Sequence, residues 1–580
     1  MKHVLTTGFL LLLLGSRASI ATDHFLTIGG GYSPTGNQIS IEKNVQFFQK
    51  MLSEMYSSDV PHDIYFSDGN NPGRDLQYQD PDVGIPRAQL LLARIFQQTR
   101  YLDLQYRSHE VAGIRGGTSR KNLDKWFSET GQTLTATDRL FIYVTAHGGR
   151  AIDKKTPKNT GLYLWNSERC QMHEFTVFLK KIPADVPIVT VMVQCYSGGF
   201  ANVIFKEGNE KQGFTEAPRC GFFATVHNRV AAGCTPDINE DDYHEYSSYF
   251  WAALRGQTRT GKPIEIPDYD QDGGVSLVEA HAYAILTSPT IDIPVKTSDA
   301  FLRKYSKLNK RESSTTQKKA RAAESKPIAS EKNQPQQKVT AGSAQNCSAD
   351  QTQDAEKLKN EEKPRDGDSA KDDASSEDRQ SPALLSRDDR YAELIKHAPS
   401  TAAAIIDGLS KTLTLCGEDR ARETQDLAKT ILDEKKKLDG QSRKLSGELK
   451  KLAGEISKSV RNRWPEFANR WHPRVNEFLA NEGQEIVRHI ESHGSYKRFE
   501  TARQQIAGLS EKRFDLDRRW IKCQRLLRAL ENVALSANLS EVATPEVQER
   551  YRQLVELESS RFGESSPVPI TAATAGEPKP

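Results

Sequence analysis

The chain has 580 residues, which is enough for two to four domains of about 100–200 residues each. Hydrophobic residues make up 37% and charged residues 27%, a polar balance that predicts a large solvated linker or exposed helix beside the buried core. The formal charge is only +3, so there is no electrostatic reason to expect nucleic acid or an anionic membrane surface as a partner.

The first 21 residues have the features of a cleavable secretory signal. A short basic start precedes an apolar run over residues 4–15, and the small residues that follow, 19–21, resemble a signal-peptidase site. The apolar run is shorter than the roughly 20 residues that span a bilayer. We therefore predict a signal peptide over residues 1–21 and a secreted or periplasmic protein without stable membrane insertion.

Five short apolar runs after the signal are rich in β-branched or aromatic residues, and we expect each to be a strand: residues 24–28, 63–66, 140–144, 187–193 and 221–226. Amphipathic patterns between them predict helices, one capped by Ser40 and one opened by Thr118. Strands that alternate with helices indicate a mostly parallel sheet covered on both faces. The expected fold class is α/β, over residues 22–304.

The composition changes after this domain. Residues 306–390 contain no aromatic residue and are dense in Lys, Glu, Asp, Ser and Gln. Such a segment cannot bury enough apolar surface to offset its chain entropy. We predict a disordered charged linker over residues 305–390.

The rest of the chain has a helical pattern. Leucine, isoleucine and valine recur at spacings of three, four and seven between residues 427 and 460, and Trp464-Pro465 ends the pattern. Further helices are expected over 475–490 and 499–533. We predict an all-α module over 391–560 and a disordered tail over 561–580. The apolar stripe must pack against another helix, either in the same chain, which we favour, or by self-association with a second chain.

Two strand ends carry candidate catalytic residues. The apolar run at 140–146 leads into His147-Gly148-Gly149, and the run at 188–194 leads into Cys195 and a Gly-rich turn. Ligands of open parallel sheets bind beyond the C-terminal ends of the strands, so these residues meet if their strands are neighbours. Either residue alone is better explained as an inert core thiol or a loop histidine.

The pair suits nucleophilic catalysis. A thiol with a pKa of about 8.5 is mostly protonated at neutral pH, and a neighbouring imidazolium lowers that pKa. The Cys195 thiolate attacks a carbonyl carbon, and His147 protonates the leaving amine. The backbone N–H of Gly148, with that of Cys195, is a candidate donor to the oxyanion.

The two strand ends resemble those of the clan of cysteine peptidases that contains caspases, legumain, metacaspases and gingipains. The nearest likeness is to the legumain family and its bacterial relatives, over about residues 25–287. Residues 161–165 look like the strand after the catalytic histidine there, and residues 222–225 are similar to the strand that lines the primary specificity pocket. The resemblance implies a caspase-like α/β sandwich and endopeptidase action on protein or peptide substrates. It implies His147 and Cys195 as the dyad, Gly148 as oxyanion donor, and no metal in the catalytic step.

The resemblance leaves specificity and reaction type open. Asp241, Asp242 and Glu245 lie where a legumain-like pocket acid is expected, although solvated loop acids are the more common explanation. A transpeptidase or transamidase uses the same acyl-enzyme. A catalytically silent binding protein that displays helices on a linker is the alternative from another class.

Residues 268–279 match the twelve-position EF-hand loop. Acids stand at positions 1, 3 and 5, glycine at 6 and glutamate at 12. We expect a structural Ca²⁺ site with six ligand positions: Asp268, Asp270, Asp272, Gly274, Ser276 and Glu279. Pro263 and Pro267 exclude an entering helix, so this is a lone loop, and an acidic turn without metal is the simpler alternative.

Seven cysteines are present, an odd number that leaves at least one thiol unpaired within the chain. Cys220 and Cys234 flank one short segment and are candidates for a disulfide, which spacing alone does not establish.

Overall fold

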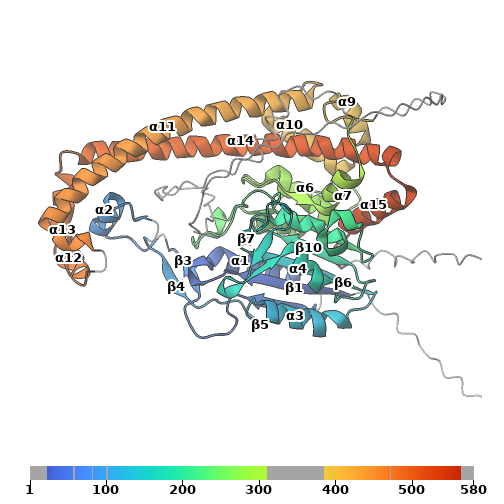
Figure 1. The fold of residues 1–580 in the computed structure, drawn as a ribbon, viewed down its shortest axis with the longest axis horizontal. Coiled ribbons are helices and arrows are strands. Elements are labelled where there is room, and N and C mark those ends of the chain that lie inside the picture. Colours follow the sequence, from blue (N-terminus) through green and yellow to red (C-terminus); the bar gives the residue numbers. More distant parts are fainter. Residues whose placement is uncertain are drawn as a thin grey trace, which may run out of the picture.

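The computed structural model describes residues 22–56, 59–80, 82–99, 102–309, 384–469 and 472–563. The expected signal peptide, residues 310–383 of the linker and residues 564–580 of the tail lie outside these ranges. Figure 1 shows an α/β domain with a long helical hairpin lying across it. No helix in the described ranges combines the length and the apolar character that crossing a bilayer requires.

A seven-stranded sheet forms the centre of the α/β domain, in the order β12-β11-β10-β6-β1-β2-β5. Every pair is parallel except β11 and β12. The sheet confirms the expected α/β class and contains all five expected strands; β5 and β12 were not expected. Its strands are β1 (Thr22–Gly30), β2 (His62–Phe66), β5 (Ile114–Gly116), β6 (Asp138–Ala146), β10 (Ile188–Met192), β11 (Arg219–Phe223) and β12 (Val295–Lys296).

Helices cover both faces of this sheet. One face packs against α1 (Ile39–Met55), α5 (Tyr246–Arg255), α6 (Leu277–Thr287) and α7 (Thr297–Tyr305). The other face packs against α3 (Arg120–Glu129) and α4 (Met172–Leu179). Along each strand, successive side chains enter opposite layers, as a pleated strand requires: Phe141 lies in the first layer, for example, and Ile142 in the second.

Two helices begin one or two residues away from the expected position. Gln38 is the N-cap of α1, so Ser40 lies in the first turn of that helix. Ser119, whose side chain accepts from the N–H of Asn122, is the N-cap of α3 in place of Thr118. Thr118 and Ser119 are both good N-cap residues, so the sequence alone does not show which of them caps the helix.

Smaller elements surround the sheet. They are α2 (Arg87–Ile95), the hairpin of β3 (Leu76–Tyr78) and β4 (Gln105–Arg107), the 3₁₀ turns η1 (Pro34–Gly36) and η5 (Ser197–Ile204), and a three-stranded sheet of β7 (Gly148–Gly149), β8 (Gly161–Tyr163) and β9 (Arg169–Gln171).

The C-terminal region is entirely helical in its described residues, and α11 and α14 form an antiparallel hairpin. Pairs such as Lys435 with Asp517 and Arg513 with Asp439 connect the two helices. The leucine stripe of α11 therefore packs within the same chain, and α11 ends before Trp464 as expected. The helices are α9 (Tyr391–Leu394), α10 (Ser400–Leu413), α11 (Arg420–Arg463), α12 (Val475–Asn481), α13 (Gly483–Glu491), α14 (Tyr496–Val542) and α15 (Pro545–Glu558).

The hairpin is anchored to the α/β domain at both ends (Figure 1). Near one end, the apolar side chains of α14 and α10 share a core with Ile285 of α6. At the other end, α13 and the end of α11 pack on Leu91 and Ile95 of α2. Residues 384–386, which were expected in the linker, also pack here: the N–H of Leu385 donates to Asn538 at 2.7 Å.

The end of the chain packs into the α/β domain. The carboxylate of Glu558 is fully buried and accepts from Lys296 Nζ at 2.6 Å and from the hydroxyl of Thr297 at 2.7 Å. Phe562, which sequence analysis assigned to the tail, lies 4.7 Å from the ring of Phe141. The boundaries expected near 304 and 561 therefore do not separate independent units, because the last residues complete the core of the first domain.

Substituting Glu558 with Ala should lower the free energy of unfolding by about 3–5 kcal/mol, because it leaves the Lys296 ammonium buried without its counter-charge. Chemical denaturation of the two proteins measures this difference. The matched control is Glu556→Ala two residues earlier, an exposed glutamate paired with Arg552, which should cost at most about 1 kcal/mol. Equal effects of the two substitutions would contradict the structural role of Glu558.

Cutting the chain once between residues 310 and 383, at an inserted site for a specific protease, should leave two fragments that remain bound to each other. Glu558, Phe562 and the base of the hairpin bury surface of both fragments. Size-exclusion chromatography at micromolar concentration should show co-elution at the mass of the uncut protein. Separation into two peaks would contradict the shared core.

Candidate active site

His147 and Cys195 lie at the same level of two adjacent parallel strands. The register of β6 and β10 pairs Val144 with Met192, and the ladder continues with the N–H of Val193 donating to the Val144 carbonyl at 3.0 Å. Continuing this register by three residues places His147 opposite Cys195. The structure therefore brings the two expected residues to one edge of the sheet, at the C-terminal ends of its strands.

His147 is held by the segment that follows β1. Its Nε2 lies 2.8 Å from the carbonyl oxygen of Gly36 and 2.9 Å from Oε1 of Gln38. The ring of Tyr32 stands edge-on to the imidazole at 5.2 Å. The residue is 8% exposed, and these contacts fix the imidazole in orientation. Neither Gln38 nor Tyr32 stood out in the sequence, because both precede a helix in an ordinary loop.

Cys195 lies in the turn between β10 and η5. Its thiol is 6% exposed, and its Sγ accepts from the N–H of Ala231 at 3.3 Å. The next residue, Tyr196, has a φ of 61°, a left-handed conformation that turns the chain sharply away from the strand. Strained residues of this kind cluster at functional turns.

Gly148 makes the approach of the two strand ends possible. A Cβ at this position would lie 1.9 Å from the carbonyl oxygen of Cys195, so no other residue type fits without moving the backbone. The sequence placed Gly148 here as a candidate oxyanion donor. The structure places its backbone directly against that of Cys195, which is where such a donor is needed.

The surroundings of Cys195 and His147 raise the pKa of both side chains. Burial, with Cys234 and Asp292 nearby, raises the pKa of the Cys195 thiol to about 12. Burial alone lowers the pKa of His147, but the interaction with Cys234 and the contact with the Gly36 carbonyl outweigh it and raise that pKa above its ordinary value. Among the described residues, no hydrogen bond joins His147 to Cys195. Such bonds are often long in free enzymes and tighten when substrate binds.

Cys234 is a neighbour of the pair that sequence analysis did not assign to the site. Its thiol hydrogen-bonds His147, its side chain is half-buried, and its φ is 57°. The expected disulfide between Cys234 and Cys220 is not formed. The sequence indicated Cys234 only as a candidate for that disulfide.

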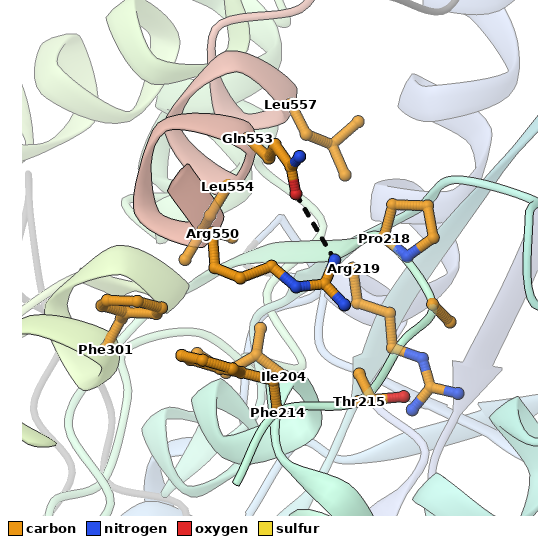
Figure 2. A pocket seen from close by; sticks show the side chains of 11 residues that line it. Ile204, Phe214, Thr215, Pro218, Arg219, Phe301, Arg550, Gln553, Leu554 and Leu557 are labelled. Atoms are coloured by element: carbon orange, nitrogen blue, oxygen red, sulfur yellow. Dashed lines mark hydrogen bonds between the residues drawn. The ribbon is translucent and has the colours of Figure 1, made fainter. Parts of the chain in front are cut away.

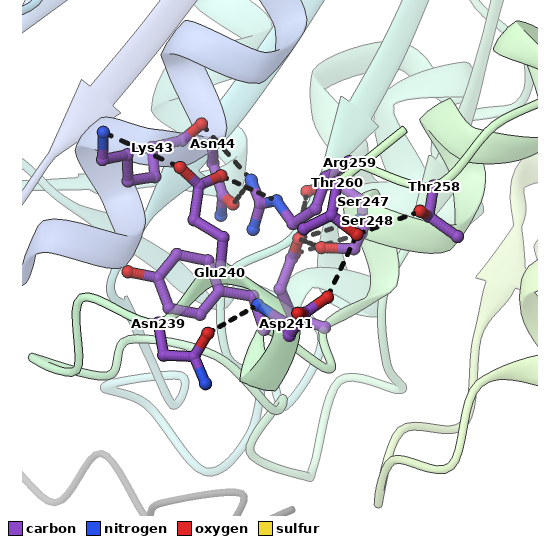
Figure 3. A network of polar contacts seen from close by, with 12 residues as sticks. Lys43, Asn44, Asn239, Glu240, Asp241, Ser247, Ser248, Thr258, Arg259 and Thr260 are labelled. Atoms are coloured by element: carbon purple, nitrogen blue, oxygen red, sulfur yellow. Dashed lines mark hydrogen bonds and ion pairs between the residues drawn. The ribbon is translucent and has the colours of Figure 1, made fainter. Parts of the chain in front are cut away.

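The three candidate pocket acids have different environments. Asp241 is exposed and accepts from the hydroxyl of Thr260 (Figure 3). It also accepts from Lys262, whereas Asp242 accepts from Asn239. Glu245 is buried at 2% exposure. Its carboxylate accepts from the N–H groups and hydroxyls of Ser247 and Ser248 at the start of α5, and its Cβ lies against Gly233. Of the three acids, Glu245 therefore lies nearest to the loop that contacts Cys195.

The EF-hand-like loop brings together three of its six expected ligands. Carboxylate oxygens of Asp268, Asp270 and Glu279 lie within 4.8 Å of one another. The Asp272 carboxylate instead forms an ion pair with Arg561, whose guanidinium also lies against Gly274.

Ser276 takes a different role in this loop. It forms a capping box with Glu279 at the start of α6. The expected exiting helix is present, and no helix precedes the loop. The Arg561 guanidinium therefore supplies a counter-charge to Asp272 in this loop.

Two further features lie apart from the strand ends. Asp68, Asp75 and His109 form a second group whose ligand atoms lie within 4.8 Å of one another. A cavity of about 50 Å³ lies between α15 and the start of β11, at the opposite end of the sheet from Cys195. Figure 2 shows Arg550 crossing it toward Gln553, to which it donates at 3.4 Å. This cavity is therefore remote from the candidate catalytic pair.

The comparisons with known proteins add little. No family model and no curated protein matches the chain. A crystal structure of a protein from Geobacter sulfurreducens, solved by structural genomics, is similar over 47% of this chain and 92% of its own length, with 11% sequence identity and a TM-score of 0.27. A likeness at this level does not bear on function, so the functional argument depends on the geometry of the site.

Proposed function

We propose that the chain is a cysteine endopeptidase that cleaves peptide bonds through His147 and Cys195. The observation that supports this proposal is the parallel pairing of β6 and β10, after whose C-terminal ends the chain continues to His147 and to Cys195 at one edge of the sheet. The glycine at 148, whose backbone lies against Cys195, supports it further. The expected signal peptide makes export part of the same proposal.

In the proposed reaction, His147 accepts the proton of the Cys195 thiol, and the thiolate attacks the carbonyl carbon of the scissile bond. The N–H groups of Gly148 and Cys195 stabilise the oxyanion. The imidazolium then gives its proton to the leaving amine, and an acyl-enzyme remains on the sulfur. Water, deprotonated by His147, hydrolyses this thioester and restores the thiol. Because burial keeps the resting thiol neutral, we propose that substrate binding brings His147 and Cys195 into contact.

Replacing Cys195 with Ala should reduce peptide cleavage by at least about 10³-fold while leaving the melting temperature close to that of the unmodified protein, since the sulfur is the proposed nucleophile. His147→Ala should have a similar effect. Cleavage of a fluorogenic peptide library by the full chain measures both. Cys170→Ala, which removes another buried thiol, is the matched control and should keep its activity.

The same assay separates the alternatives. Addition of a peptide amine that yields mainly a ligated product would identify a transpeptidase of the same fold. Normal cleavage by the Cys195→Ala protein would refute the assignment of the nucleophile. A protein that cleaves no library member would favour the silent binding protein.

We also propose that the loop at 268–279 binds Ca²⁺ as a structural ion. Asp268, Asp270 and Glu279 already converge, and Asp272 joins them if the ion displaces the Arg561 guanidinium. The loop leads directly into α6, which packs against α5 and the sheet, so an ion here would stabilise the α/β domain.

Calcium at 10 mM should raise the melting temperature of the full chain relative to chelator. At ten times Kd, with a Kd of about 10⁻³ M, binding to the native state adds about 1.4 kcal/mol, or about 3–6 °C. Combined Asp268→Asn and Asp270→Asn substitutions should remove the shift. Glu265→Gln, an exposed acid just before the loop, should retain it. Identical melting curves in calcium and in chelator would exclude the site.

A further inference from the structure

One arginine of the C-terminal hairpin is buried against the α/β domain. Arg525 lies on α14 and is 3% exposed. Its Nε donates to the carbonyl of Asp292 at 2.8 Å, and its Nη1 donates to the carbonyls of Ile285 and Ser288 at 2.7 and 2.9 Å. Its Nη2 lies 3.4 Å from the carbonyl and 3.3 Å from the hydroxyl of Thr290. All five N–H donors of the guanidinium are thus engaged by the last turn of α6 and the loop that follows it.

The same loop reaches the nucleophile. Oδ1 of Asp292, a residue 1% exposed, accepts from the N–H of Ala232 at 2.7 Å. The preceding N–H, that of Ala231, donates to Sγ of Cys195 at 3.3 Å. The second carboxyl oxygen of Asp292 has no hydrogen-bond partner among the described residues. Asp292 accepts from the N–H of Ala232, and the residue before it, Ala231, donates to the sulfur. Asp292 therefore fixes the backbone at that point.

α14 also contacts the other end of this short segment. The guanidinium of Arg229 lies over the ring of Trp520 at 5.3 Å. The carbonyl of Arg229 accepts from the N–H of Tyr196 at 2.8 Å, directly after the nucleophile. Residues 229–232 are therefore bonded to the turn of Cys195 on one side and supported by α14 and Asp292 on the other.

We propose that Asp292 is a positioning residue for Cys195: it holds the Ala231–Ala232 backbone so that an N–H points at the sulfur, and Arg525 of the C-terminal helix α14 holds Asp292 in place. The proposal rests on the peptidase function proposed above. It makes the C-terminal hairpin a structural part of the catalytic site, although it contributes no group to the reacting atoms.

The effect on the sulfur is electrostatic. An N–H that donates to sulfur stabilises the thiolate more than the thiol and lowers the pKa of Cys195, against the burial that raises it. The other titratable groups near the thiol are Cys234 and the Asp292 carboxyl itself, with His147 at the neighbouring strand end. Asp292 in turn faces Arg525 and Glu245. Loss of the Ala231 contact should therefore move the ionisation of Cys195 to higher pH.

The test compares Asp292→Ala, Asp292→Asn and Arg525→Lys in the full chain. Alkylation of Cys195 by iodoacetamide, followed by mass spectrometry across pH, reports the ionisation of the thiol without any substrate. Asp292→Ala should raise the midpoint of this profile by about one pH unit or more. It should also lower kcat about tenfold or more, with a smaller change in KM. Asp292→Asn keeps the oxygen that accepts from Ala232 and should resemble the unmodified protein.

Arg525→Lys keeps the charge but not the five-donor geometry, so it should shift the profile in the same direction as Asp292→Ala. If the Asp292→Ala protein does not fold, the alkylation profile of the Arg525→Lys protein decides whether Asp292 positions Cys195. Arg519→Met, an exposed arginine on the same helix, is the control and should change nothing.

Folded Asp292→Ala and Arg525→Lys proteins with an unshifted alkylation profile would overturn the proposal. So would an Asp292→Asn protein that behaves like Asp292→Ala, because the charge and not the acceptor would then be essential. An unmodified protein without peptidase activity would refute the proposed function alone, since the alkylation profile would still decide the role of Asp292.

Discussion

The parallel pairing of β6 with β10 is the constraint on which the candidate site depends. Both faces of these strands are buried, so a slip of one residue would turn every core side chain toward the wrong layer. The register is therefore set by hydrophobic packing, with Phe141 and Val189 in one layer and Ile142 in the other. His147 and Cys195 come to the same edge of the sheet as a consequence, although no hydrogen bond joins the two within the described ranges. Chemistry at the edge of the sheet is positioned by the core beneath it.

The C-terminal helices extend this argument beyond the sheet. The half-buried Lys296 and the buried Arg525 each bond to acceptors from the other half of the chain. A buried ion pair adds little net stability, but separating its partners is costly. The hairpin therefore stabilises the α/β domain from outside, because it packs on α6 at one end and on α2 at the other.

Local patterns predicted much of the fold and less of the site. The five central strands, the end of α11 at Trp464 and the parallel sheet follow from periodicity and turn chemistry over a few residues. His147 and Cys195 were found because each ends a strongly apolar strand. Arg525 and Asp292 were not found, because an arginine on a charged helix and an aspartate in a loop look solvated in sequence. Only the tertiary fold, across more than 200 residues, buries them together.

The EF-hand-like loop at 268–279 shows the same limit of sequence analysis, because distant residues decide which of its side chains are available. Its composition assigns six ligand positions, but Asp272 is engaged by Arg561, a residue 289 positions away, and Ser276 caps α6. Spacing reports which oxygens are available within one turn. It does not report which of them the remainder of the chain has already engaged.

The burial of Glu558 beside Lys296 also sets an order of events during biosynthesis. The two residues are 262 positions apart, so at roughly 5–20 residues per second the ribosome needs about 13–50 s to supply the counter-charge after the lysine has been made. During that interval the first domain has its strands but not the segment that closes its core. The core of the first domain is therefore completed only when translation is nearly finished.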